Sequence, residues 1–369
     1  MVYINEFKNS EIAKNLLAKI YKNLDKQGLK KRINIMEVCG THTRVIYKSG
    51  IDKLLPKNIN LIAGPGCPIC VTDSNYIDEA ILLSKNKNII LCTFADMLKV
   101  PGSISCIRDE KSEGANIKVI YSPLDCINIA KENKEKEVVF IGVGFETTTP
   151  IIALTIKKAY ENNIKNLSVL HSLKTMPNAI EKLILDKEVN IDGFICPGHV
   201  STVIGIYDFD ELARKNKIPM VLSGFECVDI IYSIYRLCEM IETKEYKCEN
   251  QYKRVARDRG NKLSKNIIYE VFKPSCSNWR GIGMIENTGL QIREKYIKFD
   301  ARYKFKLGFS NVKRFDAKTG CICGEILRGI KSPNECKLFK NICTPQKPIG
   351  PCMVSEEGTC ANFYKYKRG

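Results

Sequence analysis

The sequence contains no long hydrophobic run. No eighteen consecutive apolar residues occur anywhere in its 369 positions, so we expect no membrane-spanning helix. The first twenty residues lack the continuous apolar segment that a secretory signal peptide needs, because charged residues interrupt them every few positions. We therefore expect a cytoplasmic protein that does not associate with membranes and whose thiols are mostly kept reduced.

The sequence also lacks the motifs of common nucleic-acid-binding modules. Its net charge is +17, and a basic protein can gain affinity for nucleic acid by releasing counterions from phosphates. The lysines are scattered, however, as in residues 14–32 and 82–90, and no zinc-finger or basic-zipper spacing accompanies them. We interpret them as solvated surface residues and expect no nucleic-acid partner, with an acidic protein partner as the alternative.

Cysteine, by contrast, is abundant. The chain has 17 cysteines, and six of them fall between Cys321 and Cys360, in a segment with little hydrophobic periodicity. Such a segment buries too little apolar surface to hold itself together, so its thiols are expected to bind a metal centre or to form disulfides. In a reducing compartment, metal binding is the favoured alternative.

The spacing of these six cysteines favours an iron–sulfur cluster over zinc. Structural zinc sites usually take their ligands from close pairs, whereas the only close pair here is Cys321 and Cys323. A [4Fe–4S] cluster accepts four widely spaced thiolates, which leaves two cysteines for a dithiol beside it. Single cysteines elsewhere in apolar runs are expected to be small buried side chains: Cys92, Cys126, Cys227 and Cys238.

Short apolar segments that alternate with helical patterns predict parallel sheets covered on both faces. We expect two Rossmann-like α/β domains facing a cleft, residues 1–121 and 122–245, and a cysteine-rich iron–sulfur domain over residues 246–369. The predicted strands are residues 33–38, 59–63, 88–92, 117–121, 137–142, 167–171, 193–196 and 219–222. The predicted helices include residues 6–31, 74–85, a helix capped by Thr41 or Thr43, and two that end near residues 160 and 243.

Nearly every unusual motif directly follows a predicted strand. Ligands of open α/β sheets bind beyond the carboxyl ends of the strands. If the two α/β domains face each other, the following residues should therefore surround one cleft: Cys39, His42, Cys67, Cys70, Asp96, Glu146 and His199.

Two of these motifs carry thiol chemistry. Cys67 and Cys70 form a C-x-x-C motif, and this spacing permits a disulfide between them. In the thiolate form, the two cysteines can exchange disulfides or bind soft metals. Cys39 and His42 lie three residues apart on one loop. They are expected to ligate iron together, or His42 to activate Cys39 as a nucleophile; a buried cysteine with a capping histidine is the structural alternative.

Other motifs are less specific. Residues 142–147 begin like a dinucleotide-binding fingerprint but lack its third glycine, so we favour a tight turn that points Glu146 into the cleft over a nucleotide site. His199, in a Cys-Pro-Gly-His loop, is open to three roles: ligand, proton donor or turn residue. His171 is interpreted as a hydrogen-bonded histidine at a strand end.

Together these motifs resemble the HypD family of hydrogenase maturation proteins. The resemblance covers about residues 33–365, where the following motifs occur in the family's order: CGTHT, GPGCPIC, TFADM with VPGS, GFETTTP, CPGHVS, WRGIG and CICG…C…CTPQKP…CMVSEEGTC. One departure is Ala95, where the family usually has glycine; the neighbouring Asp96 is kept.

The resemblance implies a scaffold that assembles the Fe(CN)₂CO group of nickel–iron hydrogenases. In the family this work is shared with the small chaperone HypC, and cyanide comes from HypE, supplied by HypF. The family pattern implies that Cys39 ligates the iron together with a HypC cysteine. It also implies that the neighbouring His42 orients the groups beside Cys39 or supplies them with a proton. Cys67 and Cys70 correspond to the family's redox-active pair.

The family spacing C-x14-C-x6-C-x16-C implies that the [4Fe–4S] ligands are Cys321, Cys336, Cys343 and Cys360. Cys323 and Cys352 then correspond to a disulfide-forming pair beside the cluster, and Glu357 to a family acid. Our hypothesis is that electrons pass from the cluster through Cys323 and Cys352 to the Cys67/Cys70 pair and support chemistry at Cys39. A stand-alone iron–sulfur disulfide reductase is the alternative function.

Overall fold

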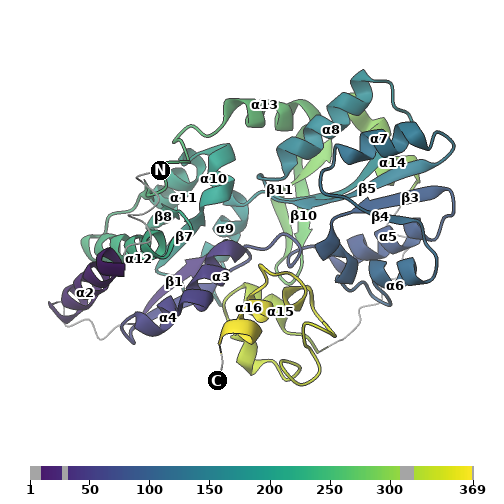
Figure 1. Cartoon of the computed structure of the whole chain (residues 1–369). Coiled ribbons are helices and arrows are strands. Elements are labelled where there is room, and N and C mark those ends of the chain that lie inside the picture. The colour runs from purple at the N-terminus through teal and green to yellow at the C-terminus, as the bar shows by residue number, and fades with distance from the viewer. Residues whose placement is uncertain (1–9, 27–31, 308–319, 368–369) are drawn as a thin grey trace.

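The structure is a computed structural model that describes residues 10–26, 32–307 and 320–367. Two α/β units lie side by side, and the C-terminal segment packs below the junction between them (Figure 1). The prediction of parallel α/β units with a cysteine-rich region is confirmed. Among the described residues, no helix is long and apolar enough to cross a membrane.

The first sheet has five parallel strands in the order β2-β1-β7-β8-β9. Its strands are β1 (Ile33–Glu37), β2 (Ile59–Ala63), β7 (Gly193–Pro197), β8 (Met220–Ser223) and β9 (Cys248–Asn250). Ile33 and Ile35 pack in one apolar core with helices α2 (Ser10–Lys26) and α12 (Cys227–Thr243). Met36 belongs to the core on the opposite face, so β1 is buried on both faces, as expected for a parallel sheet.

The second sheet has four parallel strands in the order β4-β3-β5-β6. They are β3 (Ile89–Thr93), β4 (Ile117–Val119), β5 (Glu137–Gly144) and β6 (Leu167–Leu173). Along β5, Val138 and Phe140 pack in one core while Val139 and Ile141 pack in another. The alternation buries both faces, which are covered by helices α5 (Ser74–Ser84), α6 (Ile107–Ser112), α7 (Asp125–Glu132) and α8 (Thr149–Glu161).

The pairing of the strands does not follow the predicted domain boundaries. Strands β1 and β2 pair in the same sheet as β7–β9, whereas β3 and β4 pair with β5 and β6. Each sheet therefore takes strands from both sides of residue 121, where the sequence predicted a boundary, and β9 lies beyond the boundary predicted at residue 245. Hydrophobic patterns identify strands but do not say which strands pair, because pairing depends on long-range contacts.

Most predicted elements occur within a few residues of their expected positions. The helix predicted at 6–31 is described as α2, and residues 6–9 and 27–31 lie outside the described part of the chain. The prediction that Thr41 or Thr43 caps a helix is wrong, because α3 (Gly40–Ser49) begins after Cys39. Both threonines lie in its first turn, where their hydroxyls donate to the carboxylates of Glu357 and Glu37.

The segment after β9 contains helix α13 (Lys262–Val271) and an antiparallel hairpin of β10 (Phe272–Trp279) and β11 (Gly283–Ile292). The cysteine-rich segment has little regular structure besides α15 (Cys323–Leu327) and α16 (Thr359–Tyr366), and α16 packs against α3. Cys92, Cys126 and Cys238 are buried as predicted, whereas Cys227 is half-buried. The other α-helices in the described part of the chain are α4 (Ile51–Leu54), α9 (Pro177–Ile184), α10 (Gly198–Ile204), α11 (Tyr207–Asn216) and α14 (Ala301–Lys304).

Candidate thiol cleft and cysteine-rich centre

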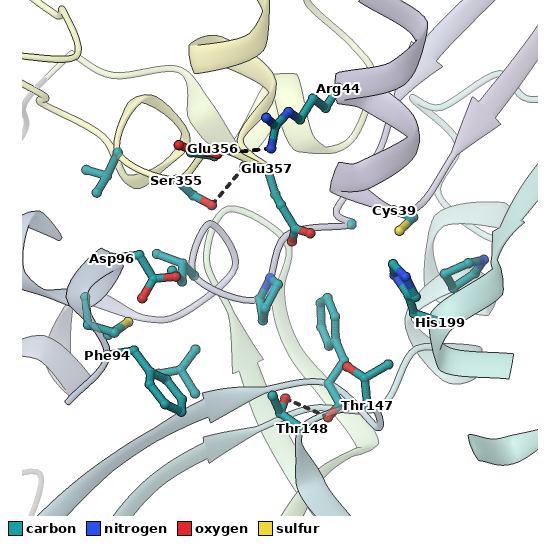
Figure 2. Close-up of a pocket in the computed structure, with 18 of the residues that line it drawn as sticks. Cys39, Arg44, Phe94, Asp96, Thr147, Thr148, His199, Ser355, Glu356 and Glu357 are labelled. Carbon is teal, nitrogen blue, oxygen red and sulfur yellow. Dashed lines mark hydrogen bonds and ion pairs between the residues drawn. The ribbon is translucent and has the colours of Figure 1, made fainter. Parts of the chain in front are cut away.

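A cleft of about 780 Å³ lies at the carboxyl ends of β1, β3, β5 and β7. A turn of the cysteine-rich segment, residues 354–357, closes one side of it. Figure 2 shows Cys39 and His199 on one wall, Asp96 on another, and the carboxylate of Glu357 pointing into the space between them. These four predicted residues, which are far apart in the sequence, therefore meet at one site.

Cys39 follows β1 and stands at the N-cap of α3. Its backbone N–H donates to Oε2 of Glu37 at 3.0 Å, which fixes the loop over a buried carboxyl. Burial raises the pKa of the Cys39 thiol to about 12, with further increases from Glu357 and Glu37 that outweigh the backbone N–H groups of the helix start. Cys39 is thus a neutral thiol near pH 7, and a bound cation would favour its ionisation.

His42 lies behind the cleft and does not line it. Its Nε2 is 2.9 Å from the carbonyl oxygen of Gly224, and because a carbonyl only accepts, Nε2 carries the proton. Nδ1 is buried and has no hydrogen-bond partner within the described residues, so its lone pair is available. Burial lowers the pKa of His42 to about 4, which keeps the ring neutral at physiological pH.

Phe225 lies between the two histidine rings. Its ring stacks on His199 with centroids 3.9 Å apart and on His42 with centroids 4.8 Å apart. Burial also lowers the pKa of His199, so both imidazoles are neutral near pH 7. Sequence reasoning missed Phe225, although the Gly-Phe-Glu triplet at residues 224–226 follows a strand in the same way as residues 144–146.

Three carboxyl groups line the cleft, and one of them, Glu356, pairs with Arg44 at 3.0 Å, which leaves Glu357 and Asp96. Glu357 accepts a hydrogen bond from the Thr41 hydroxyl at 3.0 Å, and burial raises its pKa, to which the nearby Asp96 adds. Burial likewise raises the pKa of Asp96. Ala95 leaves Asp96 on the cleft wall, as the sequence predicted. Carboxyl and thiol groups that are costly to ionise at this cleft would be stabilised in their ionised form by a positive ion.

Cys67 and Cys70 are joined by a disulfide in the loop between β2 and α5. Both sulfur-bearing side chains are buried, but Pro68 and Ile69 between them line the cleft. On the other side, Sγ of Cys70 lies 3.9 Å from the carbonyl oxygen of Pro351, the residue before Cys352. The C-x-x-C loop therefore contacts the cleft on one side and the neighbourhood of Cys352 on the other.

All six cysteines of the C-terminal segment line one small enclosed cavity, together with Ile326, Leu338, Phe339 and Met353. The N–H of Ile349 donates to Sγ of Cys343 at 3.3 Å, a contact of the kind that supports cluster thiolates. Within the described ranges, no three Cys, His, Asp or Glu side chains already stand at metal-ligand positions. The soft donors and apolar wall fit a cluster, around which the thiols would have to close.

Arg280 connects the C-x-x-C loop with this cavity and was not singled out from the sequence. Its backbone N–H donates to the carbonyl of Val71 at 2.9 Å, next to Cys70. Its charge contributes to lowering the pKa of Cys323, after the larger effect of a hydrogen bond from Cys321, and it acts in the same direction on Cys352. The WRGIG segment at residues 279–283 was the available signal.

Glu146 and His171 lie outside the cleft. Glu146 does not line the cleft, contrary to the expectation from the sequence, because its neighbours Phe145 and Thr147 face the cleft and Glu146 faces a second cavity. His171 lies on β6 with Nε2 3.4 Å from Asp300, in agreement with a hydrogen-bonded strand residue. The glycines at 142 and 144 belong to β5 and form no phosphate-binding loop.

The fold and site define an α/β protein with two parallel sheets. Its cleft holds a buried thiol, a neutral imidazole and carboxyl groups, and a disulfide loop lies between this cleft and a cavity lined by cysteines. The family model named HypD, described as "Hydrogenase formation hypA family", matches residues 11–367. The chain therefore belongs to the HypD family of hydrogenase maturation factors.

Individual relatives match over their whole length. The chain is 41% identical to hydrogenase maturation factor HypD of Rhodobacter capsulatus over 370 residues, covering 99% of this chain and 98% of the relative. It is 40% identical to a putative hydrogenase expression/formation protein of Methanocaldococcus jannaschii, with both chains fully covered. It is also 40% identical to HypD of Cupriavidus necator, covering 100% of this chain and 98% of the relative.

Proposed function

We propose that this protein is a cytoplasmic scaffold on which the Fe(CN)₂CO group of nickel–iron hydrogenases is assembled. The observation that carries the proposal is the convergence of Cys39, His199, Asp96 and Glu357 on one cleft. Iron is the cargo of this site, with Cys39 as the ligand from this chain and a cysteine of a HypC-type chaperone as the second ligand. A wide cleft leaves room for diatomic ligands and for the partner's residue.

The electrostatics of the cleft support a cation at Cys39. Burial and two carboxyl groups hold the thiol in its neutral form, so iron binding and loss of the thiol proton are coupled. His199 is neutral and lines the cleft, which makes it the acceptor for that proton. His42, held by Gly224 and stacked on Phe225, fixes the position of this array from behind.

The two cysteine pairs supply the redox chemistry. A [4Fe–4S] cluster held by Cys321, Cys336, Cys343 and Cys360 would supply single electrons when bound. The Cys323/Cys352 dithiol then reduces the Cys67–Cys70 disulfide: one disulfide forms as the other breaks, and two electrons and two protons move between the pairs. The contact between Cys70 and Pro351 supports this route, because it brings the C-x-x-C loop next to Cys352.

The proposed partners follow from the family role. A HypC-type chaperone shares the iron, and HypE, charged by HypF, donates cyanide at the open side of the cleft. The scheme has no role for nucleic acid.

Metal analysis of single variants tests whether the proposed sites are separate. The chain is purified anaerobically with its HypC-type partner, and iron and sulfide are counted per chain. Cys39→Ala should lose about one iron and keep the cluster iron and sulfide. Cys336→Ala should lose the sulfide. The exposed Cys276 provides a matched control, and Cys276→Ala should change neither count. Loss of sulfide in the Cys39 variant would contradict separate sites.

The alternative function is a stand-alone iron–sulfur disulfide reductase, favoured by the disulfide at Cys67–Cys70 beside the cysteine-lined cavity. A reductase of a soluble substrate has no need of Cys39. Reduction of a disulfide substrate that is unaffected by Cys39→Ala, together with no cleft iron in any preparation, would favour this alternative.

A further inference from the structure

A second cavity, of about 380 Å³, lies at the junction of the two α/β units, between α9, α11, α13 and the β10–β11 hairpin. It is separate from the thiol cleft, although the chain passes between the two at residues 145–147. Four carboxyl side chains line it, at Glu146, Glu181, Asp208 and Glu211. Such an acidic cavity is unusual in a chain whose net charge is +17.

Glu146 lies at the buried end of this cavity and is 3% exposed. Its Oε1 accepts a hydrogen bond from the backbone N–H of Met176 at 2.8 Å. Its Oε2 is buried and has no hydrogen-bond partner within the described part of the chain. A buried carboxylate oxygen without a partner is costly, so this atom indicates a ligand that donates to it.

The charges around Glu146 are poorly balanced. Lys215 is the lysine that lines the cavity, and it pairs with Glu181 at 2.6 Å. Among the described residues, Glu146, Asp208 and Glu211 form no ion pair; Lys265 acts on Asp208 from outside the lining, and Tyr269 adds a neutral phenol. Burial raises the pKa of Glu146 to about 7, and Asp208 raises it further. A cation in the cavity would reverse this unfavourable environment.

The rest of the lining combines apolar and polar side chains. The apolar ones are Pro177, Ile204, Leu212, Pro274 and Leu290, and the polar ones are Thr175, Asn178 and Asn287. A bare metal ion has no use for the apolar side chains, and within the described residues no three carboxyl, imidazole or thiol groups are placed to ligate one. Apolar side chains next to carboxylates would instead bind a ligand whose methylene groups lie between cationic ends.

We propose that this cavity binds a small aliphatic polyamine, with one ammonium group donating to Oε2 of Glu146, a second near Asp208 and Glu211 at the rim, and the methylene chain along the apolar wall. The proposal does not depend on the function assigned to the thiol cleft.

Calorimetry on the whole purified chain, without iron or partner, tests the proposal with spermidine as the probe at pH 8 and constant ionic strength. Spermidine should bind saturably at one site per chain. Glu146→Gln should weaken binding about tenfold or more, which corresponds to the loss of one partly buried ion pair. Asp208→Asn, at an exposed rim position, should weaken binding less, and it serves if the buried variant does not fold.

The matched control is Glu132→Gln, on the exposed end of α7 outside the cavity, which should bind spermidine like the wild type. Near pH 7, binding should also release protons from Glu146, seen as a dependence of the heat on the buffer's ionisation enthalpy that disappears in Glu146→Gln. No saturable binding, equal weakening by Glu132→Gln, or Mg²⁺ binding as tightly as spermidine would each overturn the proposal. None of these outcomes bears on iron at Cys39.

Discussion

Gly40 and Glu357 touch across the edge of the thiol cleft. A β-carbon on residue 40 would lie 2.4 Å from Cβ of Glu357 and 2.5 Å from its carbonyl oxygen, which is closer than atoms can approach. This contact joins the loop that carries Cys39 to the turn of the cysteine-rich segment. It brings the Glu357 carboxylate to within hydrogen-bond distance of Thr41 and over the cleft.

Gly40→Ala should therefore displace the turn at residues 354–357. We expect destabilisation of about 1–3 kcal/mol from overpacking, together with loss of cleft iron. Urea unfolding measures the first and metal analysis the second. Gly142→Ala is the control, because a β-carbon at residue 142 would lie 3.2 Å from its nearest neighbour, a methyl group of Val169. Cleft iron retained in Gly40→Ala would show that the position of the turn does not matter for the site.

Glu357→Gln should make the Cys39 thiol more acidic. The Glu357 carboxylate is one cause of the raised pKa of Cys39, after burial, so removing the charge favours the thiolate. Alkylation by iodoacetamide, followed by mass spectrometry between pH 7 and 10, measures the change. Cys39 should react faster in the variant, while the exposed Cys276 should react at its wild-type rate. Equal Cys39 rates in the two proteins would contradict the electrostatic coupling.

Nuclear magnetic resonance of the chain labelled at its three histidines tests the stacked array. His42 should stay neutral down to about pH 4, with the proton on Nε2. His199 should titrate below its ordinary pKa. In Phe225→Leu, the loss of one stacked face exposes His199 to water, and its pKa should rise toward the ordinary value. An unchanged His199 titration would show that Phe225 has no part in setting its environment.

Glu146→Gln should change the pH dependence of stability. The folded-state pKa of Glu146 is raised from its ordinary value of 4.5 to about 7, so the folded state holds its proton more tightly than the unfolded state. The contribution of Glu146 to the stability of the wild type therefore falls as pH rises from about 4.5 through 7. The free energy of unfolding of the variant minus that of the wild type should be greater at pH 8 than at pH 4, by on the order of 2 kcal/mol. Urea unfolding at both pH values measures the difference, and parallel curves would contradict it.

The sequence predicted the strands and the order of motifs well, because buried parallel strands read as short apolar runs followed by turn residues. Cys39, Asp96, His199 and Glu357 were each recognised before the structure brought them together. The pairing of β1 with β7 was not predictable, since it joins residues about 160 positions apart. Glu146 was misplaced because a loop can turn each successive side chain toward a different cavity.

Residues that act through others were the hardest to foresee. Phe225 and Arg280 have no chemistry that stands out in a sequence. Phe225 matters because it stacks on two histidine rings, and Arg280 because it contacts the residue after Cys70 and its charge acts on two thiols. Gly40 is similar, because only the approach of Glu357 from more than three hundred residues away explains why a side chain is excluded there.

Infrared spectroscopy of the chain, purified anaerobically with its HypC-type partner, tests the central claim most directly. The account predicts cyanide and carbonyl stretching bands that disappear in Cys39→Ala and persist in Cys276→Ala. Bands that survive the Cys39 substitution, or no bands in a wild-type complex that retains its partner and its iron, would contradict assembly of the iron group at this cysteine.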